Sequence, residues 1–267
     1  MKANNHQQFN CGCELEYYVY EESTFIFNIA VASTDNQTIL TENLVLTPNL
    51  PHEEYIEPIL HNRFLRVNVP PGKFNLYYQA DVELSYPQIN PEQKILAKPP
   101  SFLPLDMLRY VYPSRYCESD QLFELTFQRF AQIEAGYEQV KVVCDWIHNN
   151  ITYVLGSSDN ETTALETVKG RAGVCRDFAH LAIAMCRALN IPARFVTGYA
   201  YKLDPPDFHA YFEVYLDNAW YLFDATKLVP LEGLIRIGTG RDAADVSFAT
   251  IFGEIELNRM NLWTNLL

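Results

Sequence analysis

The spacing of hydrophobic residues changes once along this chain of 267 residues, and the change divides it into two parts. Between about residues 12 and 84, apolar and polar residues alternate, most regularly at 76–84. Alternation with period two places apolar side chains on one face of a strand. Turn-forming runs at 34–36 and 70–72 separate the strands. The pattern predicts an antiparallel β-sandwich-like domain over residues 1–85, in which no cluster of titratable residues stands out.

Six prolines interrupt residues 86–114, and helical spacing follows them. Proline removes a backbone donor and breaks regular structure, so we expect a linker in this segment. Beyond the linker we expect an α+β domain over residues 115–267, with helices packed on an antiparallel sheet. The spacing predicts helices at 122–133, 140–147, 163–169 and 174–189, with Gly170 ending the third, and strands at 194–201, 209–216 and 219–224.

Composition narrows the functional classes. The net charge is −13, and the 20 lysines and arginines form no cluster. Binding to nucleic acid or to anionic membranes needs clustered cations, so we expect neither partner. No apolar run reaches the roughly 18–20 residues of a membrane span, and the first eight residues lack the apolar core of a signal peptide. The expected location is the cytoplasm.

The six cysteines lack the regular spacing of a disulfide framework or a zinc site. We therefore expect reduced thiols and no bound metal. Cys144 and Cys186 fall within helical apolar patterns and are expected to pack in the core. Cys11 and Cys13 flank Gly12 and are expected in strand-edge structure, because a single Cys-x-Cys is a weak ligand signal.

Cys175 differs from the other cysteines because it stands at the predicted start of the helix at 174–189. The first turn of a helix has unpaired N–H groups and the positive end of the backbone dipole. Both favour a thiolate over a thiol, and the N–H groups are able to bind an oxyanion. The position therefore indicates a nucleophile.

His209 and Asp224 follow in the order expected of a base and of the group that orients it. The residues at 217–218 predict a two-residue hairpin turn between the strands that carry them. Residues whose numbers sum to 435 then face one another, which makes His209 and Asp224 diagonal neighbours within hydrogen-bonding reach. A second oxyanion donor is usual beside such a nucleophile, and Tyr153 is the residue that we nominate.

Five runs of sequence around these residues resemble the bacterial transglutaminase-like superfamily of cysteine proteases. They are Gly-Val-Cys-Arg-Asp-Phe-Ala-His-Leu at 173–181, Ile-Pro-Ala-Arg-Phe-Val-Thr-Gly-Tyr at 191–199, His-Ala-Tyr at 209–211, Phe-Asp-Ala-Thr at 223–226 and Gly-Arg-Asp-Ala-Ala-Asp-Val at 240–246. The resemblance covers about residues 140–250, and the β-rich first part is similar to the N-terminal domain that often precedes this one. It implies a papain-like, transglutaminase-like core with catalysis by Cys175, His209 and Asp224, and it implies no requirement for a cofactor or for calcium.

Two positions depart from the pattern of that family. Arg176 stands where relatives often have glutamine, and its guanidinium would be able to hold a thiolate or to select an acidic substrate group. Tyr211 stands where relatives often have tryptophan, which changes the shape of a pocket more than the mechanism. Asp177 and His180 recur in the family, and we expect them to support the triad indirectly.

These residues predict acyl transfer from an amide or peptide through a cysteine acyl-enzyme. We expect water to take the acyl group, which would make the protein a protease or amidase acting on a peptide or protein substrate. Transfer to an amine, as in a protein transglutaminase, is the second interpretation. A non-catalytic peptide-binding module is the third, and an intact triad counts against it.

Overall fold

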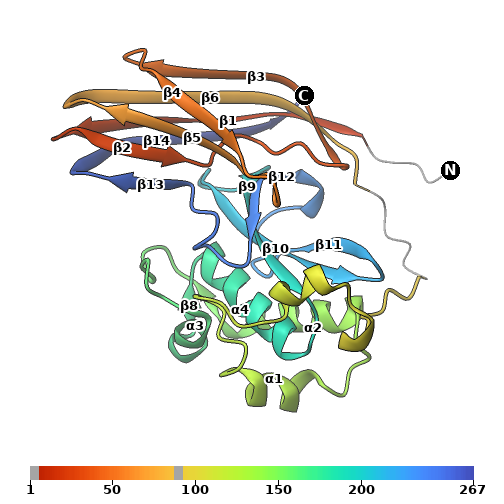
Figure 1. The fold of residues 1–267 in the computed structure, drawn as a ribbon. Coiled ribbons are helices and arrows are strands. Elements are labelled where there is room, and N and C mark those ends of the chain that lie inside the picture. The colour runs from red at the N-terminus through yellow and green to blue at the C-terminus, as the bar shows by residue number, and fades with distance from the viewer. Residues whose placement is uncertain (1–5, 87–92) are drawn as a thin grey trace.

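A computed structural model describes residues 6–86 and 93–267 of the chain. Figure 1 shows two stacked β-sheets in its upper part and, below them, a smaller sheet with helices beneath it. The α+β class expected from the sequence is confirmed. Pro87 and Pro91 of the predicted linker, and the first five residues of the chain, lie outside the described residues.

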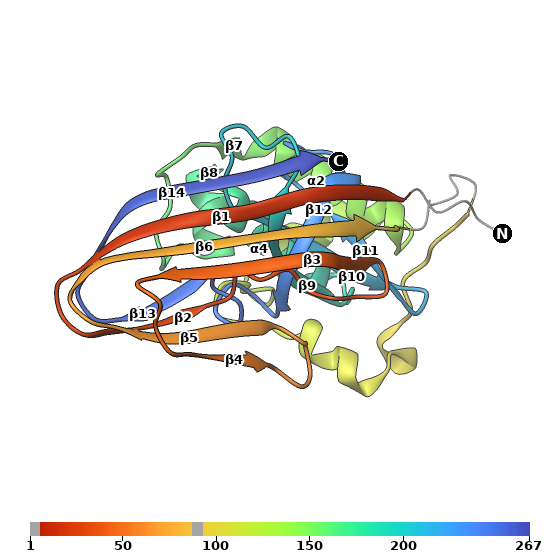
Figure 2. The same cartoon turned by 90° about the horizontal axis from the view of Figure 1, so that it is seen from above.

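The upper part is a sandwich of two four-stranded antiparallel sheets, seen from above in Figure 2. In sheet order the strands are β14 (Ile255–Leu266), β1 (Gln7–Val19), β6 (Gly72–Leu84) and β3 (Gln37–Thr47) in one sheet, and β13 (Ala249–Phe252), β2 (Ser23–Phe27), β5 (Arg63–Val69) and β4 (His52–Ile56) in the other. In β6 every second side chain from Phe74 to Leu84 is buried. The alternation predicted from the sequence is therefore confirmed.

The last two strands differ from the predicted domain boundary. β14 pairs with β1, with Trp263 opposite Gly12, and β13 pairs with β2. The end of the chain therefore completes the N-terminal sandwich, and does not belong to a separate unit over residues 115–267. β14 exposes most of its side chains without regular alternation, so its sequence pattern does not reveal its partner.

Cys11 and Cys13 lie in the middle of their sheet, which corrects the expected strand-edge position. β1 has a neighbouring strand on each side, β6 and β14, and both thiols are buried. A side-chain carbon at Gly12 would collide with the carbonyl oxygen of Tyr78 and with the ring of Trp263. Glycine is therefore needed at the point where these neighbours approach β1 closely. Burial raises the pKa of both thiols, to about 12 for Cys13.

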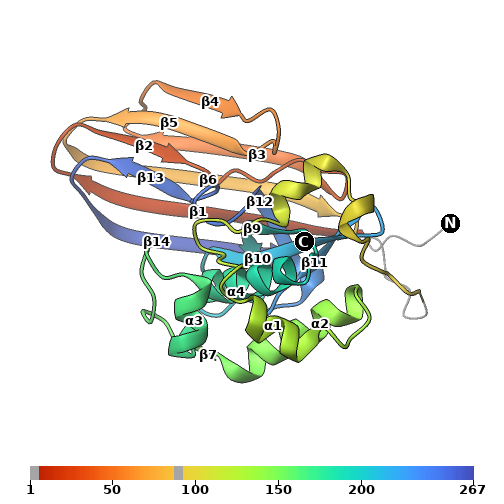
Figure 3. The ribbon, with the colours of Figure 1, turned by 60° about the horizontal axis from the view of Figure 1, so that its bottom comes forward.

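The lower part packs its helices against a four-stranded antiparallel sheet. Figure 3 shows the central helix, α4 (Cys175–Ala188), beside β9 (Ala193–Ala200) and β10 (His209–Leu216), with the other helices outside it. Residues 177–188 of α4 are all buried. The elements are α1 (Phe123–Phe130), α2 (Tyr137–Asn150), α3 (Ala164–Gly170) and α4 (Cys175–Ala188), the sheet β11 (Ala219–Phe223), β10 (His209–Leu216), β9 (Ala193–Ala200) and β12 (Leu234–Gly240), and a short parallel pair, β7 (Thr152–Tyr153) and β8 (Ala172–Gly173).

All four predicted helices are present, but the third ends differently from the prediction. Gly170 is still helical, and Arg171 is the residue that adopts the left-handed conformation, with φ 54°. Three 3₁₀-helices complete the described elements: η1 (Pro100–Phe102), η2 (Leu105–Tyr110) and η3 (Leu231–Gly233). In the described ranges, no helix has both the length and the apolar character that crossing a membrane requires.

The two parts share a hydrophobic core and buried polar contacts. Apolar side chains of β9 and β12 pack within the core of the sandwich. The side-chain amide of Gln37 bonds the main-chain N–H and C=O of Arg236, both at 2.8 Å. The amide of Asn62 does the same for Thr239, at 2.9 and 2.8 Å. These amides take the place of a neighbouring strand, and they fix the sandwich to the sheet that carries His209.

Candidate active site

Cys175 begins α4, as the sequence predicts, and its side chain is half-buried. The preceding residue, Val174, is extended, and its N–H donates to Asp177 Oδ2 at 2.8 Å. This bond ties the start of the helix to its first turn, where the helix dipole is positive. The other five cysteines are buried. Cys175 is therefore the one cysteine positioned to meet a substrate.

His209 and Asp224 meet in a buried hydrogen bond of 2.9 Å between Nε2 and Oδ2. His209 opens β10, and Asp224 directly follows β11. The ladder between these strands begins with Phe212 opposite Phe223, so paired numbers sum to 435 as predicted. Both turn residues at 217–218 have positive φ, as a tight hairpin requires. The hairpin register thus brings the histidine and the carboxylate together.

The surroundings of His209 favour its protonated form. Burial alone would lower the pKa of the ring, but the hydrogen bond that the ring donates to Asp224 and the nearby sulfur of Cys175 raise it to about 10. Since Nε2 donates to the carboxylate, Nδ1 is the nitrogen left for the thiol. Nδ1 makes no hydrogen bond of full geometry within residues 6–86 and 93–267. The ring is therefore placed to exchange a proton with Cys175.

Tyr153, the nominated oxyanion donor, lies beside Cys175 at the end of β7. Burial and the thiol of Cys175 raise the pKa of the Tyr153 hydroxyl, and the backbone N–H of Cys175 acts against them. The hydroxyl therefore keeps its proton beside the nucleophile. The structure brings Tyr153 to the nucleophile, as the sequence-based nomination requires.

Asp177 and His180 are fully buried, which fits the expected supporting role. His180 lies between the rings of Tyr116 and Phe195, with centroids 5.0 and 4.8 Å away. Its Nε2 accepts the N–H of Ala243 at 3.1 Å, and burial lowers the pKa of the ring. A neutral His180 therefore fastens α4 to the segment that carries Ala243.

The guanidinium of Arg176 makes its polar contacts with neighbouring residues of the same chain. Its guanidinium donates to the carbonyl oxygen of Asp159, and its Nε lies 3.6 Å from Asp177 Oδ1. Neither contact involves the thiol of Cys175. The structure thus gives this cation a part in anchoring the loop that carries Asp159.

Tyr211 packs beside His209 on the same face of β10. The two ring centroids are 6.3 Å apart. Tyr211 is fully buried, and its hydroxyl has no hydrogen-bond partner in the described part of the chain. Its ring therefore supports the His209 ring by packing.

Thr226 is a residue of the site that the sequence analysis does not identify. Its N–H donates to Asp224 Oδ1 at 2.8 Å, and its hydroxyl oxygen lies 2.8 and 2.9 Å from the two carboxylate oxygens. The signal is local: a short polar side chain two residues beyond an aspartate, at the end of a strand, commonly closes such a turn.

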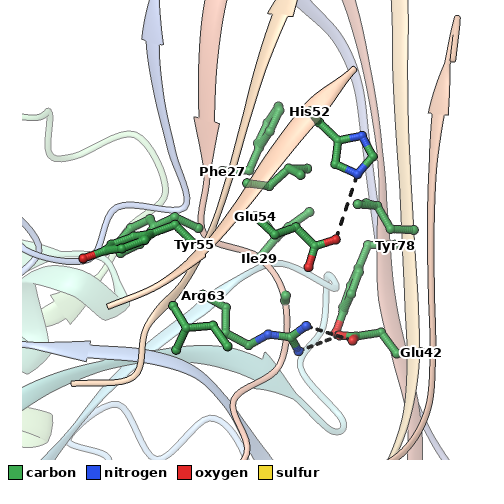
Figure 4. Close-up of a pocket in the computed structure, with 13 residues that line it drawn as sticks. Phe27, Ile29, Glu42, His52, Glu54, Tyr55, Arg63 and Tyr78 are labelled. Atoms are coloured by element: carbon green, nitrogen blue, oxygen red, sulfur yellow. Dashed lines mark hydrogen bonds and ion pairs between the residues drawn. The ribbon is translucent and has the colours of Figure 1, made fainter. Parts of the chain in front are cut away.

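A second polar cluster lies in the sandwich, where the sequence shows no titratable constellation. Arg63 forms a two-pronged ion pair with Glu42, with N–O distances of 2.7 and 2.8 Å, and Tyr78 donates to the same carboxylate at 2.6 Å. His52 and Glu54 of β4 point into the same cavity of about 310 Å³ (Figure 4). These residues come from four different strands, so no local sequence pattern predicts the cluster.

The fold and the site together define a transglutaminase-like protein. Residues 125–225 match the model of the transglutaminase-like superfamily, and residues 7–99 match that of the bacterial transglutaminase N-terminal domain. A crystal structure of a "putative cysteine protease" from Cytophaga hutchinsonii superimposes with a TM-score of 0.95 and 44% identity, over 100% of this chain and 92% of that one. The chain belongs to the transglutaminase-like superfamily.

Two mycobacterial proteins are more distant relatives. An uncharacterised protein of Mycobacterium leprae is 27% identical in an alignment of 144 positions that covers 51% of either chain. An uncharacterised protein of Mycobacterium tuberculosis is 34% identical in an alignment of 125 positions that covers 41% of this chain and 40% of its own length. The chain thus spans about half, or less, of the length of these two curated relatives. Membership of the superfamily supports cysteine-based catalysis as a class of chemistry.

Proposed function

We propose that the protein catalyses cysteine-dependent acyl transfer on amide or peptide substrates, ending in hydrolysis, with Cys175, His209 and Asp224 as catalytic residues. The observation that carries this proposal is the buried Nε2–Oδ2 hydrogen bond of 2.9 Å beside the one cysteine that is not buried. A histidine–carboxylate pair next to a thiol at a helix N-terminus favours the thiolate and so a nucleophilic attack.

The first half of the reaction forms an acyl-enzyme. The thiolate of Cys175 attacks the substrate carbonyl carbon, and the carbonyl oxygen becomes an oxyanion. The backbone N–H of Cys175 and the hydroxyl of Tyr153 are the proposed donors to that oxyanion. The Nδ1 proton of His209 then passes to the leaving amine, while Asp224 holds Nε2–H and stabilises the charge of the ring. A thioester and a free amine result.

The second half releases the acyl group. Neutral His209 takes a proton at Nδ1 from a water molecule, which attacks the thioester and restores the thiol. An amine in place of water would give the transglutaminase reaction. The Cytophaga hutchinsonii relative carries a protease name, which supports water as the acceptor and a peptide or protein as the substrate.

Alkylation by iodoacetamide, read for each cysteine by mass spectrometry, tests the nucleophile. At pH values below the ordinary thiol pKa of about 8.5, Cys175 should react fastest of the six cysteines. His209→Ala should remove the faster alkylation of Cys175. Cys144→Ala changes a buried cysteine and should preserve it. Ordinary reactivity of Cys175, insensitive to His209, would overturn the proposal and favour the binding module.

Incubation with casein and dansylcadaverine separates the two acceptors. Hydrolysis yields casein fragments without dansyl label, whereas transfer yields intact casein that carries the label. Cys175→Ala should give neither product. Labelled casein as the main product would make the protein a transglutaminase.

A further inference from the structure

The chain after β11 forms a tight polar turn around Asp224. Thr226 N–H and Thr226 Oγ1 both lie 2.8 Å from Asp224 Oδ1, and Leu228 N–H donates to Thr226 Oγ1 at 3.2 Å. Asp224 is 7% exposed and Thr226 is 3% exposed. Water is therefore poorly placed to replace any of these bonds.

The chemistry of the groups sets the direction of each bond. Since Thr226 Oγ1 accepts from Leu228, its single proton is the one that points to the carboxylate, which only accepts when ionised. Asp224 then has three donors: Thr226 N–H, Thr226 O–H and His209 Nε2–H. This set fixes both carboxylate oxygens, and it fixes the proton of His209 on Nε2.

Helix α2 holds the same turn from outside the sheet. His148 Nδ1 lies 3.0 Å from the carbonyl oxygen of Thr226, so Nδ1 carries a proton that it donates. One turn earlier on α2, Asp145 forms an ion pair with Lys227. The strand ladder ends at Phe223, so α2 and not the ladder sets the position of Thr226.

We propose that Thr226 is a positioning residue of the active site, which aims Asp224 Oδ2 at His209 Nε2. The inference rests on the proposed function, because the aim of Asp224 matters only where His209 moves a proton. Without the hydroxyl, one donor to Asp224 is lost and the carboxylate is freer to rotate about its Cβ–Cγ bond. The His209 imidazolium is then less well supported.

Any effect of Thr226 on His209 passes through Asp224. Among the described residues, the titratable groups that face the ring are Cys175 from α4, Tyr211 from β10, Asp224 after β11 and Asp207 just before β10. Of these, Asp224 bonds the ring directly. Thr226 makes no side-chain hydrogen bond to the ring or to the thiol in the described residues.

Two variants test the role of the hydroxyl through the pH profile of Cys175 alkylation by iodoacetamide. Thr226→Val removes the hydroxyl and keeps the shape, whereas Thr226→Ser keeps the hydroxyl. Valine should lower the rate at neutral pH about tenfold, the effect of losing one charge-assisted hydrogen bond. It should also move the upper inflection, where the imidazolium loses its proton, to lower pH. Serine should restore both.

Thr167→Val is the matched control. Thr167 is 1% exposed, and its hydroxyl donates at 2.8 Å to the carbonyl oxygen of Thr163, the residue that caps the start of α3. This variant should have a lower melting temperature than the wild type and an unchanged pH profile of Cys175 alkylation. Should Thr226→Val fail to fold, Thr226→Ala serves in the same way and carries the same expectation.

The outcomes separate this inference from the proposed function. Ordinary reactivity of Cys175 in the wild type would overturn both. An activated Cys175 in the wild type, with the same upper inflection in Thr226→Val, would overturn the positioning role alone. The role is also overturned if the rate falls without movement of the inflection, or if serine behaves like valine.

Discussion

The polar cluster of the sandwich and that of the active site are built differently. In the sandwich, Arg63 gives two N–H groups to Glu42, and Tyr78 gives its hydroxyl proton to the same carboxylate. Both charges of this ion pair are therefore bonded within the cluster. In the active site, Asp224 is equally well bonded, but Nδ1 of His209 is left without a full hydrogen bond among the described residues.

The difference separates a structural cluster from a chemical one. A buried charge destabilises a fold unless it is paired, so a cluster that serves the fold pairs all its members. A ring nitrogen left open beside a half-buried thiol is poor for stability but suited to proton transfer. Changes in the two clusters should therefore affect different properties of the protein.

Cys175→Ala should have the largest effect. It removes the proposed nucleophile, so peptide hydrolysis should fall about 10⁴-fold or more, while the urea midpoint stays near that of the wild type. Cys186→Ala makes the same change at a buried site in α4 and should show the reverse: a loss of stability with hydrolysis retained. Residual hydrolysis near the wild-type rate in Cys175→Ala would remove the distinction between the clusters.

Asp224→Asn should come second, with a loss of about 10³- to 10⁴-fold in kcat. The amide keeps the shape of the carboxylate but neither carries its charge nor holds the same His209 tautomer. The upper inflection of Cys175 alkylation should also move to lower pH. A variant that hydrolyses peptides normally would show that the buried pair is only structural.

Arg63→Ala should change stability and leave the chemistry alone. The change removes the partner of Glu42, and we expect the free energy of unfolding, measured in urea, to fall by about 2 kcal/mol. This is less than the loss expected when one member of a fully buried ion pair is removed. The discount reflects the exposure of the two side chains, 20% for Arg63 and 28% for Glu42. Alkylation of Cys175 should be unchanged.

A double variant sharpens that result. Glu42→Leu with Arg63→Leu removes both charges, and it should recover most of the lost stability, because apolar replacement of a buried ion pair is often nearly neutral. If the double variant stays as unstable as Arg63→Ala, the pair itself specifies the packing of β3 against β5.

The smallest effect concerns pH. The pKa of His209 is raised from the ordinary 6.5 to about 10, so the folded chain binds this proton more tightly than the unfolded chain. Its contribution to stability is then complete below pH 6.5 and is lost as the pH rises through about 10. Urea unfolding of Cys175→Ala, with and without His209→Gln, isolates the part of the shift that Asp224 causes. Because the thiol no longer raises the pKa of His209 in this background, the loss there should come at a lower pH than in the wild type. A stability difference that stays constant across the window would show an unprotonated ring.

Much of the active site follows from local sequence. The start of α4, the hairpin turn at 217–218 and the pairing of residues whose numbers sum to 435 all match the prediction. Each depends on residues close in the chain: a change of period, a pair of turn formers, the register that a two-residue loop imposes. For that reason, Cys175, His209 and Asp224 could be nominated as site residues from local sequence.

The features that the sequence did not predict share a different cause. β14 joins β1 across nearly the whole chain, and the Glu42–Arg63 pair joins two sheets. Thr226 is held by His148 of α2, 78 positions away. A local pattern shows which face of a strand is apolar, but it does not show which distant strand or helix will cover it.

Local sequence was enough to predict the elements, their amphipathic faces and the chemistry available at Cys175, His209 and Asp224, because these depend on side-chain identity and short-range spacing. Three features became visible in the fold alone: β14 closes the N-terminal sandwich, Tyr153 lies beside the nucleophile, and Nδ1 of His209 has no full hydrogen bond among the described residues. Those features arise from packing between segments far apart in the chain, where burial and pairing of polar groups select one arrangement among many.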